Sequence, residues 1–130
     1  MKMLRQHEIT VRVRYSETDG QGRLHHANFI NLFELGRTEM LRAAGISYRE
    51  FEEQGMMLVV KQIQCDYHLP IRFDDELQLR TTTTSSKGAR LRHRYELFLN
   101  DQKAAEGETL IACVGPSGRA CRLPDWMQLD

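Results

Sequence analysis

The sequence predicts an α+β fold in which a five-stranded antiparallel sheet wraps around one long helix. Two observations support this prediction: one strand-like segment precedes a long helical segment, and four more strand-like segments follow it, joined mostly by short turn sequences. No linker, repeat or low-complexity segment interrupts the 130 residues. We therefore expect a single domain over residues 1–130.

The first strand and the long helix are predicted from their periodicity. Apolar residues alternate with polar ones at Ile9, Val11, Val13 and Tyr15, as in a strand with one buried face. Residues 28–45 (NFINLFELGRTEMLRAAG) carry apolar residues at helical spacing over about four turns, and Gly45 is placed to end the helix in a left-handed cap. Gly36 costs about 1 kcal/mol relative to alanine inside a helix, which indicates close approach of another part of the chain. Ser47 and Glu50 have the spacing of a capping box for a short second helix.

The remaining four strands are predicted from β-branched and alternating residues between turn signals. They cover residues 56–69, 76–86, 89–99 and 103–115. Lys87-Gly88 and Asn100-Asp101 are the turn sequences that predict the two hairpins.

Composition and charge exclude several classes of protein. Hydrophobic residues make up 41% of the chain and charged residues 28%, and 18 basic residues balance 18 acidic ones. We expect neither nucleic acid nor a membrane surface as a partner, because no net charge attracts them. No run approaches the ~20 apolar residues of a membrane span, and the N-terminus has no signal-peptide pattern. The sequence predicts a cytoplasmic protein.

The three cysteines predict neither disulfides nor a zinc site. Cys65, Cys113 and Cys121 are odd in number and have no CxxC spacing. We interpret all three as reduced thiols, and Cys65 and Cys113 as small side chains that pack in apolar strands. Sequence alone leaves open a catalytic cysteine with a histidine nearby in space.

Residues 15–29 (YSETDGQGRLHHANF) carry the most specific motif. The pattern Y-x-x-T-D-x-x-G-x-x-x-H-x-x-F is formed by Tyr15, Thr18, Asp19, Gly22, His26 and Phe29, and FELGRTEMLR and YHLPIRFDDEL follow it. With these segments, nearly the whole chain resembles the hotdog-fold thioesterases of the 4-hydroxybenzoyl-CoA thioesterase type. The similarity is closest to the short bacterial acyl-CoA thioesterases associated with the Tol-Pal gene cluster.

The resemblance implies a hotdog fold, with Asp19 as the catalytic carboxylate. It also implies a dimer that joins two sheets and builds each active site from both subunits. The chain departs from the pattern at Gly20-Gln21 and at Arg23, Leu24 and His25, where relatives commonly have an aliphatic pair and an aromatic residue. We expect the acyl pocket to differ there.

The loop also suits thioester hydrolysis on chemical grounds. A thiol with a pKa of ~8.5 can leave as the thiolate, so a general acid is dispensable. Asp19 could attack the carbonyl or act as general base on a water, and the first N–H groups of the helix, near His26 and Ala27, could stabilise the oxyanion. Gly22 would let the backbone approach the substrate. The alternative for Asp19 is that it only caps a turn.

The resemblance places His26 and Tyr15 in the active site, where His26 would orient the acid or the water. The alternatives are a helix-capping histidine and a core tyrosine. We predict no metal site, because His25 and His26 are adjacent and no HxxxH or HExxH pattern supplies a second ligand on the same face. We interpret Glu17 as a solvated loop charge.

A row of cations suggests a site for the phosphates of coenzyme A. Arg90, Arg92 and Arg94 share one face of a predicted strand, and Lys87 lies at the preceding turn. Lys87, Arg90 and Arg92 are the candidate phosphate ligands, because guanidinium groups bind phosphates bidentately. The alternative is a solvated strand face paired with acids on the neighbouring strand.

Together these features predict a thioesterase that hydrolyses an acyl- or aryl-CoA, or an acyl carrier protein thioester. It would need no cofactor, because coenzyme A is part of the substrate. A non-catalytic acyl-thioester sensor on the same fold is the alternative; a hotdog dehydratase is disfavoured, since its histidine-proline signature is missing. We expect a homodimer at minimum, and a homotetramer if dimers associate, because exposed sheet edges are usually paired.

Overall fold

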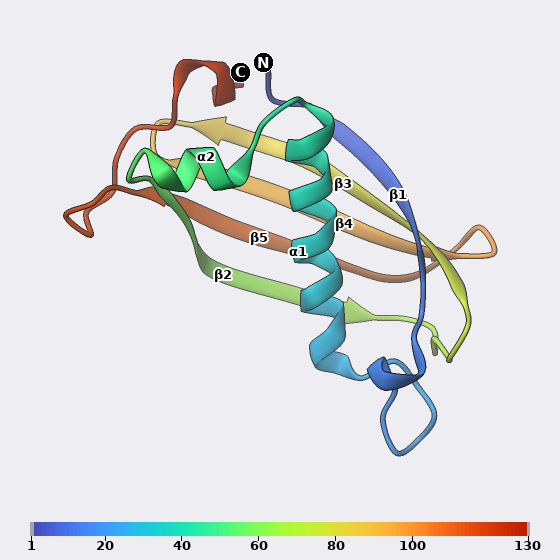
Figure 1. Cartoon of the computed structure of the whole chain (residues 1–130). Helices are drawn as coiled ribbons and strands as arrows, with labels where there is room; N and C mark the ends of the chain where they lie inside the picture. The colour runs from blue at the N-terminus through green and yellow to red at the C-terminus, as the bar shows by residue number, and fades with distance from the viewer. Residues whose placement is uncertain (1, 130) are drawn as a thin grey trace.

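The computed structural model describes residues 2–129 and shows one antiparallel sheet curved around a central helix (Figure 1). The order along the chain is β1 (Gln6–Arg12), η1 (Tyr15–Glu17), α1 (His26–Ala43), α2 (Tyr48–Glu53), β2 (Met57–Tyr67), β3 (Glu76–Lys87), β4 (Arg90–Leu99), β5 (Gln102–Val114) and η2 (Asp125–Met127). In space the strands follow the order β1-β3-β4-β5-β2, so β1 and β2 form the two edges. The predicted fold class is confirmed.

Both predicted hairpin turns are confirmed. Gly88 has a φ of 61° in the two-residue connection between β3 and β4. Asn100 and Asp101 have φ values of 50° and 66°, the left-handed conformation that a tight hairpin requires and that asparagine and aspartate tolerate. Local turn chemistry thus sets the β3–β4 and β4–β5 pairings.

Helix α1 lies across the concave face of the sheet and presents one apolar side to it. The helix has 18 residues, about five turns, and it begins at His26, near where its first N–H groups were predicted. Gly45 ends it with a φ of 83°, as predicted. A Cβ on Gly36 would lie 2.5 Å from Thr81 Oγ1 and 2.9 Å from a methyl carbon of Leu79. The predicted close approach is therefore real, and side chains of β3 make it.

The first strand is shorter than predicted. Strand β1 ends at Arg12, and Tyr15 begins the 3-10 turn η1 instead of continuing the alternation. The Glu17 carboxylate accepts a hydrogen bond from the Arg14 N–H at 2.7 Å, and the Glu17 N–H donates to the Arg14 carbonyl at 3.0 Å. These bonds turn the chain away from the sheet. They also correct the interpretation of Glu17, which is a structural residue of the loop.

The core has two apolar clusters beneath the helices. One surrounds Phe33 and Tyr95, whose rings stack at 4.5 Å. The other lies under α2 and the C-terminal segment, and it includes Leu91 and Ile111. All three cysteines are free; Cys113 is buried in this second cluster, and its Sγ lies 3.2 Å from that of Cys121. Within residues 2–129, no helix has the length and apolarity that crossing a membrane requires.

Candidate active site

The loop between η1 and α1 is a tight structure held by its own backbone. The Asp19 N–H donates to the Arg23 carbonyl at 2.8 Å, and the Gly22 N–H donates to the Asp19 carbonyl at 3.0 Å. The Glu17 carbonyl accepts from the His25 N–H at 2.9 Å and from the Asn28 side-chain amide at 2.7 Å. The acid-containing loop is thus fixed directly against the start of α1.

The two carboxylate oxygens of Asp19 have different surroundings. Oδ1 accepts hydrogen bonds from the N–H groups of Gln21 at 2.8 Å and Arg23 at 3.2 Å. Oδ2 has no hydrogen-bond partner within residues 2–129. The N–H groups of Arg23 and Gln21 lower the pKa of the carboxyl, because they stabilise its charged form. Asp19 therefore caps the turn through one oxygen and stays ionised, and its other oxygen is not used by the described residues.

His25 is the N-cap of α1, a role that the sequence did not indicate. Its Nδ1 accepts a hydrogen bond from the Ala27 N–H at 3.0 Å. The Ala27 N–H, one of the two predicted oxyanion donors, is therefore already paired, and it can donate to a substrate only if His25 releases it. The N–H of His26 has no partner in the described part of the chain, as helix geometry requires of a first-turn donor. It is the available donor at this helix end.

The side chains of His26 and Tyr15 are exposed beside the loop. The rings of His25 and His26 stack at 4.2 Å. Tyr15 is 76% exposed and makes an edge contact with Phe73 at 5.5 Å, so the alternative of a core tyrosine is wrong. The capping histidine is His25, so the alternative of a helix cap for His26 is wrong too. Both side chains are free to meet a ligand.

Tyr67 of β2 also lies at the helix start, although no role was predicted for it from the sequence. Its hydroxyl donates to the His26 carbonyl at 3.2 Å, and its ring packs on Phe29 at 4.7 Å. Burial, and then the Cys65 side chain, raise the pKa of Tyr67 to about 12, so the phenol stays neutral. In the sequence, only the position of Tyr67 at the start of the YHLPIRFDDEL segment could have pointed to a role. Its contact with the start of α1 can be known only from the fold.

A hollow of about 230 Å³ adjoins the loop. Its lining includes Arg23, Leu24, Phe29, Tyr67, Leu69 and Ile71. Arg23 and Leu24 are two of the positions at which the sequence departs from the motif. Gly22 has a φ of 75°, and no atom lies within 4 Å of where its Cβ would be. The loop therefore offers open space directly beside its backbone.

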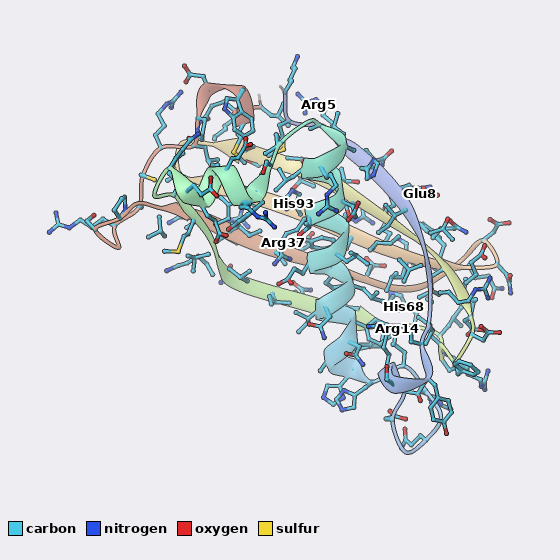
Figure 2. All side chains as sticks on the ribbon, in the orientation of Figure 1. Arg5, Glu8, Arg14, Arg37, His68 and His93 are labelled. Carbon is cyan, nitrogen blue, oxygen red and sulfur yellow. The ribbon has the colours of Figure 1, made fainter. Side chains whose placement is uncertain are left out.

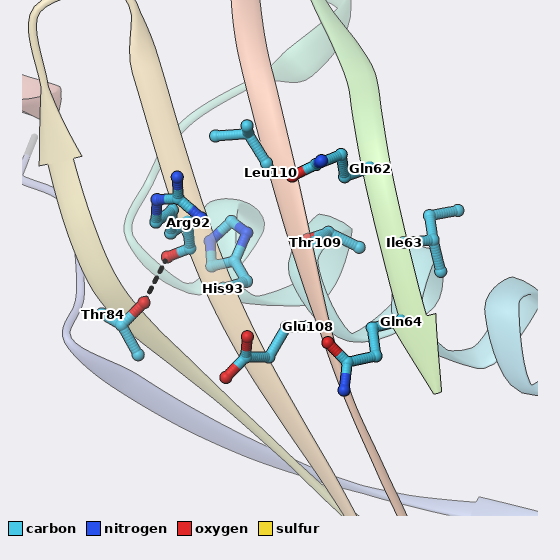
Figure 3. A pocket seen from close by; sticks show the side chains of 9 residues that line it. All are labelled: Gln62, Ile63, Gln64, Thr84, Arg92, His93, Glu108, Thr109 and Leu110. Carbon is cyan, nitrogen blue, oxygen red and sulfur yellow. Dashed lines mark hydrogen bonds between the residues drawn. The ribbon is translucent and has the colours of Figure 1, made fainter. Parts of the chain in front are cut away.

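The cationic stripe lies at the other end of the sheet. Lys87 is separated from Glu76, at the loop end of β3, by a strand roughly 35–40 Å long. Arg92 lines a larger hollow of about 440 Å³ on the sheet, together with Gln62, Gln64 and Glu108 (Figure 3). One protomer thus brings Tyr15, Asp19, Gly22, His26 and Ala27 together but does not bring Lys87, Arg90 or Arg92 to them.

The stripe is only partly paired with acids. Arg94 lies 3.5 Å from Glu96 and 4.0 Å from Glu106. Lys87, Arg90 and Arg92 form no ion pair with any residue from 2 to 129. The solvated-face alternative therefore describes Arg94, whereas the three candidate phosphate ligands keep free cationic groups.

Comparisons with known proteins identify the family to which the chain belongs. The family model described as "Thioesterase-like superfamily" matches residues 13–129. The chain is 34% identical over 107 residues to the acyl-CoA thioester hydrolase YbgC of Escherichia coli O157:H7, covering 82% of this chain and 80% of that one. It is also 34% identical over 105 residues to the acyl-CoA thioesterase YbgC of Haemophilus influenzae, covering 80% and 77%.

A solved thioesterase structure has the same fold. The DHNA-CoA thioesterase from Staphylococcus aureus superposes with a TM-score of 0.87 at 26% identity, covering 91% of this chain and 80% of that one. From the matched family model, these relatives and the shared architecture, we conclude that the chain belongs to the thioesterase-like superfamily of hotdog-fold hydrolases.

Proposed function

We propose that the protein hydrolyses the thioester of an acyl- or aryl-CoA with Asp19 as its catalytic carboxylate. The observation that carries the proposal is the arrangement of Asp19 beside the start of α1. Oδ1 of Asp19 accepts hydrogen bonds from two N–H groups, and Oδ2 accepts none from the described residues. The adjacent start of α1 presents the unpaired N–H of His26. The YbgC relatives, named as an acyl-CoA thioester hydrolase and an acyl-CoA thioesterase, support the reaction class.

In the proposed reaction the carbonyl oxygen of the thioester accepts a hydrogen bond from the His26 N–H. Oδ2 of Asp19 either attacks the carbonyl carbon, giving an anhydride that water hydrolyses, or removes a proton from the attacking water. The C–S bond breaks and the thiol leaves as thiolate. His26 and Tyr15 lie where they could orient the acid or the water. No cofactor takes part, because coenzyme A enters only with the substrate.

The proposal of coenzyme A as the substrate carrier rests on the cationic stripe. If Lys87, Arg90 and Arg92 bind the phosphates of coenzyme A, they must come from another protomer, since one chain holds them far from Asp19. We therefore propose a homodimer, or a homotetramer of two dimers. The free edge of β2 is the candidate dimer contact, because Met57, Val59 and Ile63 are exposed along it.

Turnover assays with purified protein test the proposal. A panel of acyl-CoA and aryl-CoA thioesters, with the matching acyl carrier protein thioesters, separates the two carriers and identifies the acyl group. Release of thiol from at least one member is the expected result. Binding of these thioesters without any turnover would instead support the sensor alternative.

A further inference from the structure

A third cavity, of about 310 Å³, lies between α1, α2 and the sheet, away from the loop. Its lining includes Arg37, Tyr48, Leu58, Leu91, His93 and Ile111. Arg37 lies eleven residues after His26 on α1, about 16 Å along the helix axis. The cavity is therefore separate from the catalytic loop within one protomer.

Its polar lining has hydrogen-bonding groups that the protein leaves unused. His93 is 1% exposed, and neither of its ring nitrogens has a partner among residues 2–129. Nη1 of Arg37 is also buried and unpartnered in this part of the chain, while Nη2 lies 3.6 Å from the exposed Glu34 carboxylate. The Arg37 side chain also interacts with the Tyr95 hydroxyl. Figure 2 labels both side chains between α1 and the sheet. Buried polar groups are normally satisfied by protein or by water, so two of them lining one cavity make it a candidate ligand site, although His93 also lines the larger hollow on the sheet.

The charge of the cavity selects the kind of ligand. Burial, and then the nearby Arg37, lower the pKa of His93 to about 3, so its ring is neutral and carries one N–H donor. The Tyr48 hydroxyl is already engaged, because it accepts from the Leu58 N–H at 3.0 Å. Arg37 is then the buried cation, with Glu34 at the rim. A guanidinium fork with a free N–H is best matched by a carboxylate.

The size and walls of the cavity exclude a single water as its content. One water needs only about 10–15 Å³ of such volume, a small part of the 310 Å³. Leu58, Leu91 and Ile111 make the rest of the lining apolar, and 310 Å³ is at the lower end of small-ligand pockets. The occupant needs an apolar body and one anionic end.

We propose that this cavity binds a short apolar chain that ends in a carboxylate. The carboxylate lies on Arg37 Nη1 and the His93 N–H, and the chain lies along Leu58, Leu91 and Ile111. Two sources share this chemistry: a free carboxylic acid, and the far end of an ω-carboxyacyl thioester. The second source rests on the proposed function. Antiparallel pairing of two β2 edges would bring the Leu58 end of one strand near the Tyr67 end of its partner, and so this cavity near the partner's loop.

Ligand binding tests the site without depending on catalysis. Methyl NMR titrations with hexanoate and with the uncharged, isosteric hexanamide should show shifts at Leu58, Leu91 and Ile111, with hexanoate binding about tenfold tighter or more. Arg37→Met should abolish this preference. Arg42→Met is the matched control, since Arg42 lies on the same helix, pairs with Glu39 and does not line this cavity. Equal affinity for the two compounds, or no binding of either, would overturn the proposal.

A second variant guards against misfolding. His93→Phe keeps an aromatic ring but removes the N–H, so it should weaken hexanoate more than hexanamide, because a carboxylate accepts the stronger, charge-assisted hydrogen bond. If both variants keep the wild-type circular dichroism spectrum and the wild-type preference for hexanoate, the carboxylate is not bound by these side chains.

Kinetics distinguish the two sources. If the far end of the substrate occupies the cavity, Arg37→Met should lower the ratio of kcat/KM for adipoyl-CoA over hexanoyl-CoA by about tenfold or more. An unchanged ratio, together with lost hexanoate binding, assigns the cavity to a free acid. If no thioester is hydrolysed at all, the proposed function fails, and the titrations still decide whether the cavity binds a carboxylate.

Discussion

At the scale of single residues, Asp19 divides its two oxygens between structure and chemistry. Turn capping and catalysis were alternatives for this residue, but the geometry makes them compatible. Capping through Oδ1 fixes the direction of Oδ2 and keeps the carboxyl ionised. The capping bonds therefore prepare the group for the proposed reaction.

The lowered pKa of Asp19 predicts the pH dependence of activity. A carboxylate with a lowered pKa stays charged until the pH falls below 3.8, the ordinary value for aspartate. We expect kcat/KM to stay flat as the pH falls from neutral to this value, and to decline only below it. A pH–rate profile, with enzyme returned to neutral pH to check for irreversible loss, measures this. A decline in kcat/KM that is centred above pH 3.8 and is caused by protonation of an aspartate would contradict the assignment.

His25 gives a stability prediction. His25→Ala removes the acceptor for the Ala27 N–H, and we expect a loss of about 0.5–2 kcal/mol in the free energy of unfolding. His25→Asn restores a capping acceptor and should recover most of it. Urea denaturation measures both, and His26→Ala serves as the control because the exposed His26 ring caps nothing. Equal losses in the alanine variants would show that the cap is unimportant.

At the scale of elements, the contact between α1 and β3 depends on Gly36. Alanine would favour the helix by about 1 kcal/mol, but its Cβ would overlap Thr81 Oγ1 and the Leu79 side chain. Overpacking of this kind costs about 1–3 kcal/mol. We expect Gly36→Ala to lower the free energy of unfolding measured in denaturant.

A double variant separates packing from other causes. Thr81→Ala removes the oxygen that would lie 2.5 Å from the methyl group of an alanine at position 36. Gly36→Ala combined with Thr81→Ala should therefore be less destabilised than the sum of the single variants. Strict additivity of the two changes would mean that this contact does not limit the approach of the helix.

The elements also show which features a sequence can predict. Turns at Asn100-Asp101 and the cap at Gly45 were predicted correctly, because their signals lie within a few residues. The end of β1 was not, because the hydrogen bonds between Arg14 and Glu17 override an alternation that continues to Tyr15. Histidine is an uncommon N-cap, so the sequence pattern did not predict that His25 caps the helix. The position of Arg37 and His93 in the lining of one cavity depends on strand register and helix placement, which local sequence patterns do not contain.

At the scale of the whole molecule, one chain holds a complete loop but only a distant cationic stripe. We propose that two chains associate through β2, so that the stripe of one chain lies near the loop of the other. Strand β2 is an 11-residue edge strand with exposed apolar side chains. We expect light scattering to give a mass of two or four chains. Val59→Lys places a charge on this edge and should shift the mass toward one chain and reduce turnover together. A wild-type monomer that is fully active would refute the shared site.

The central claim is that the free oxygen of Asp19 performs the hydrolysis. Its most direct test is kcat for Asp19→Asn on the best thioester of the panel, because asparagine keeps the size and the acceptor for the turn but removes the charge. We predict a fall in kcat of ~10² or more with KM nearly unchanged, whereas the control Asp101→Asn, in the β4–β5 turn where asparagine suits the positive φ, should match the wild type. An Asp19→Asn enzyme with wild-type kcat would contradict the account and leave Asp19 as a capping residue only.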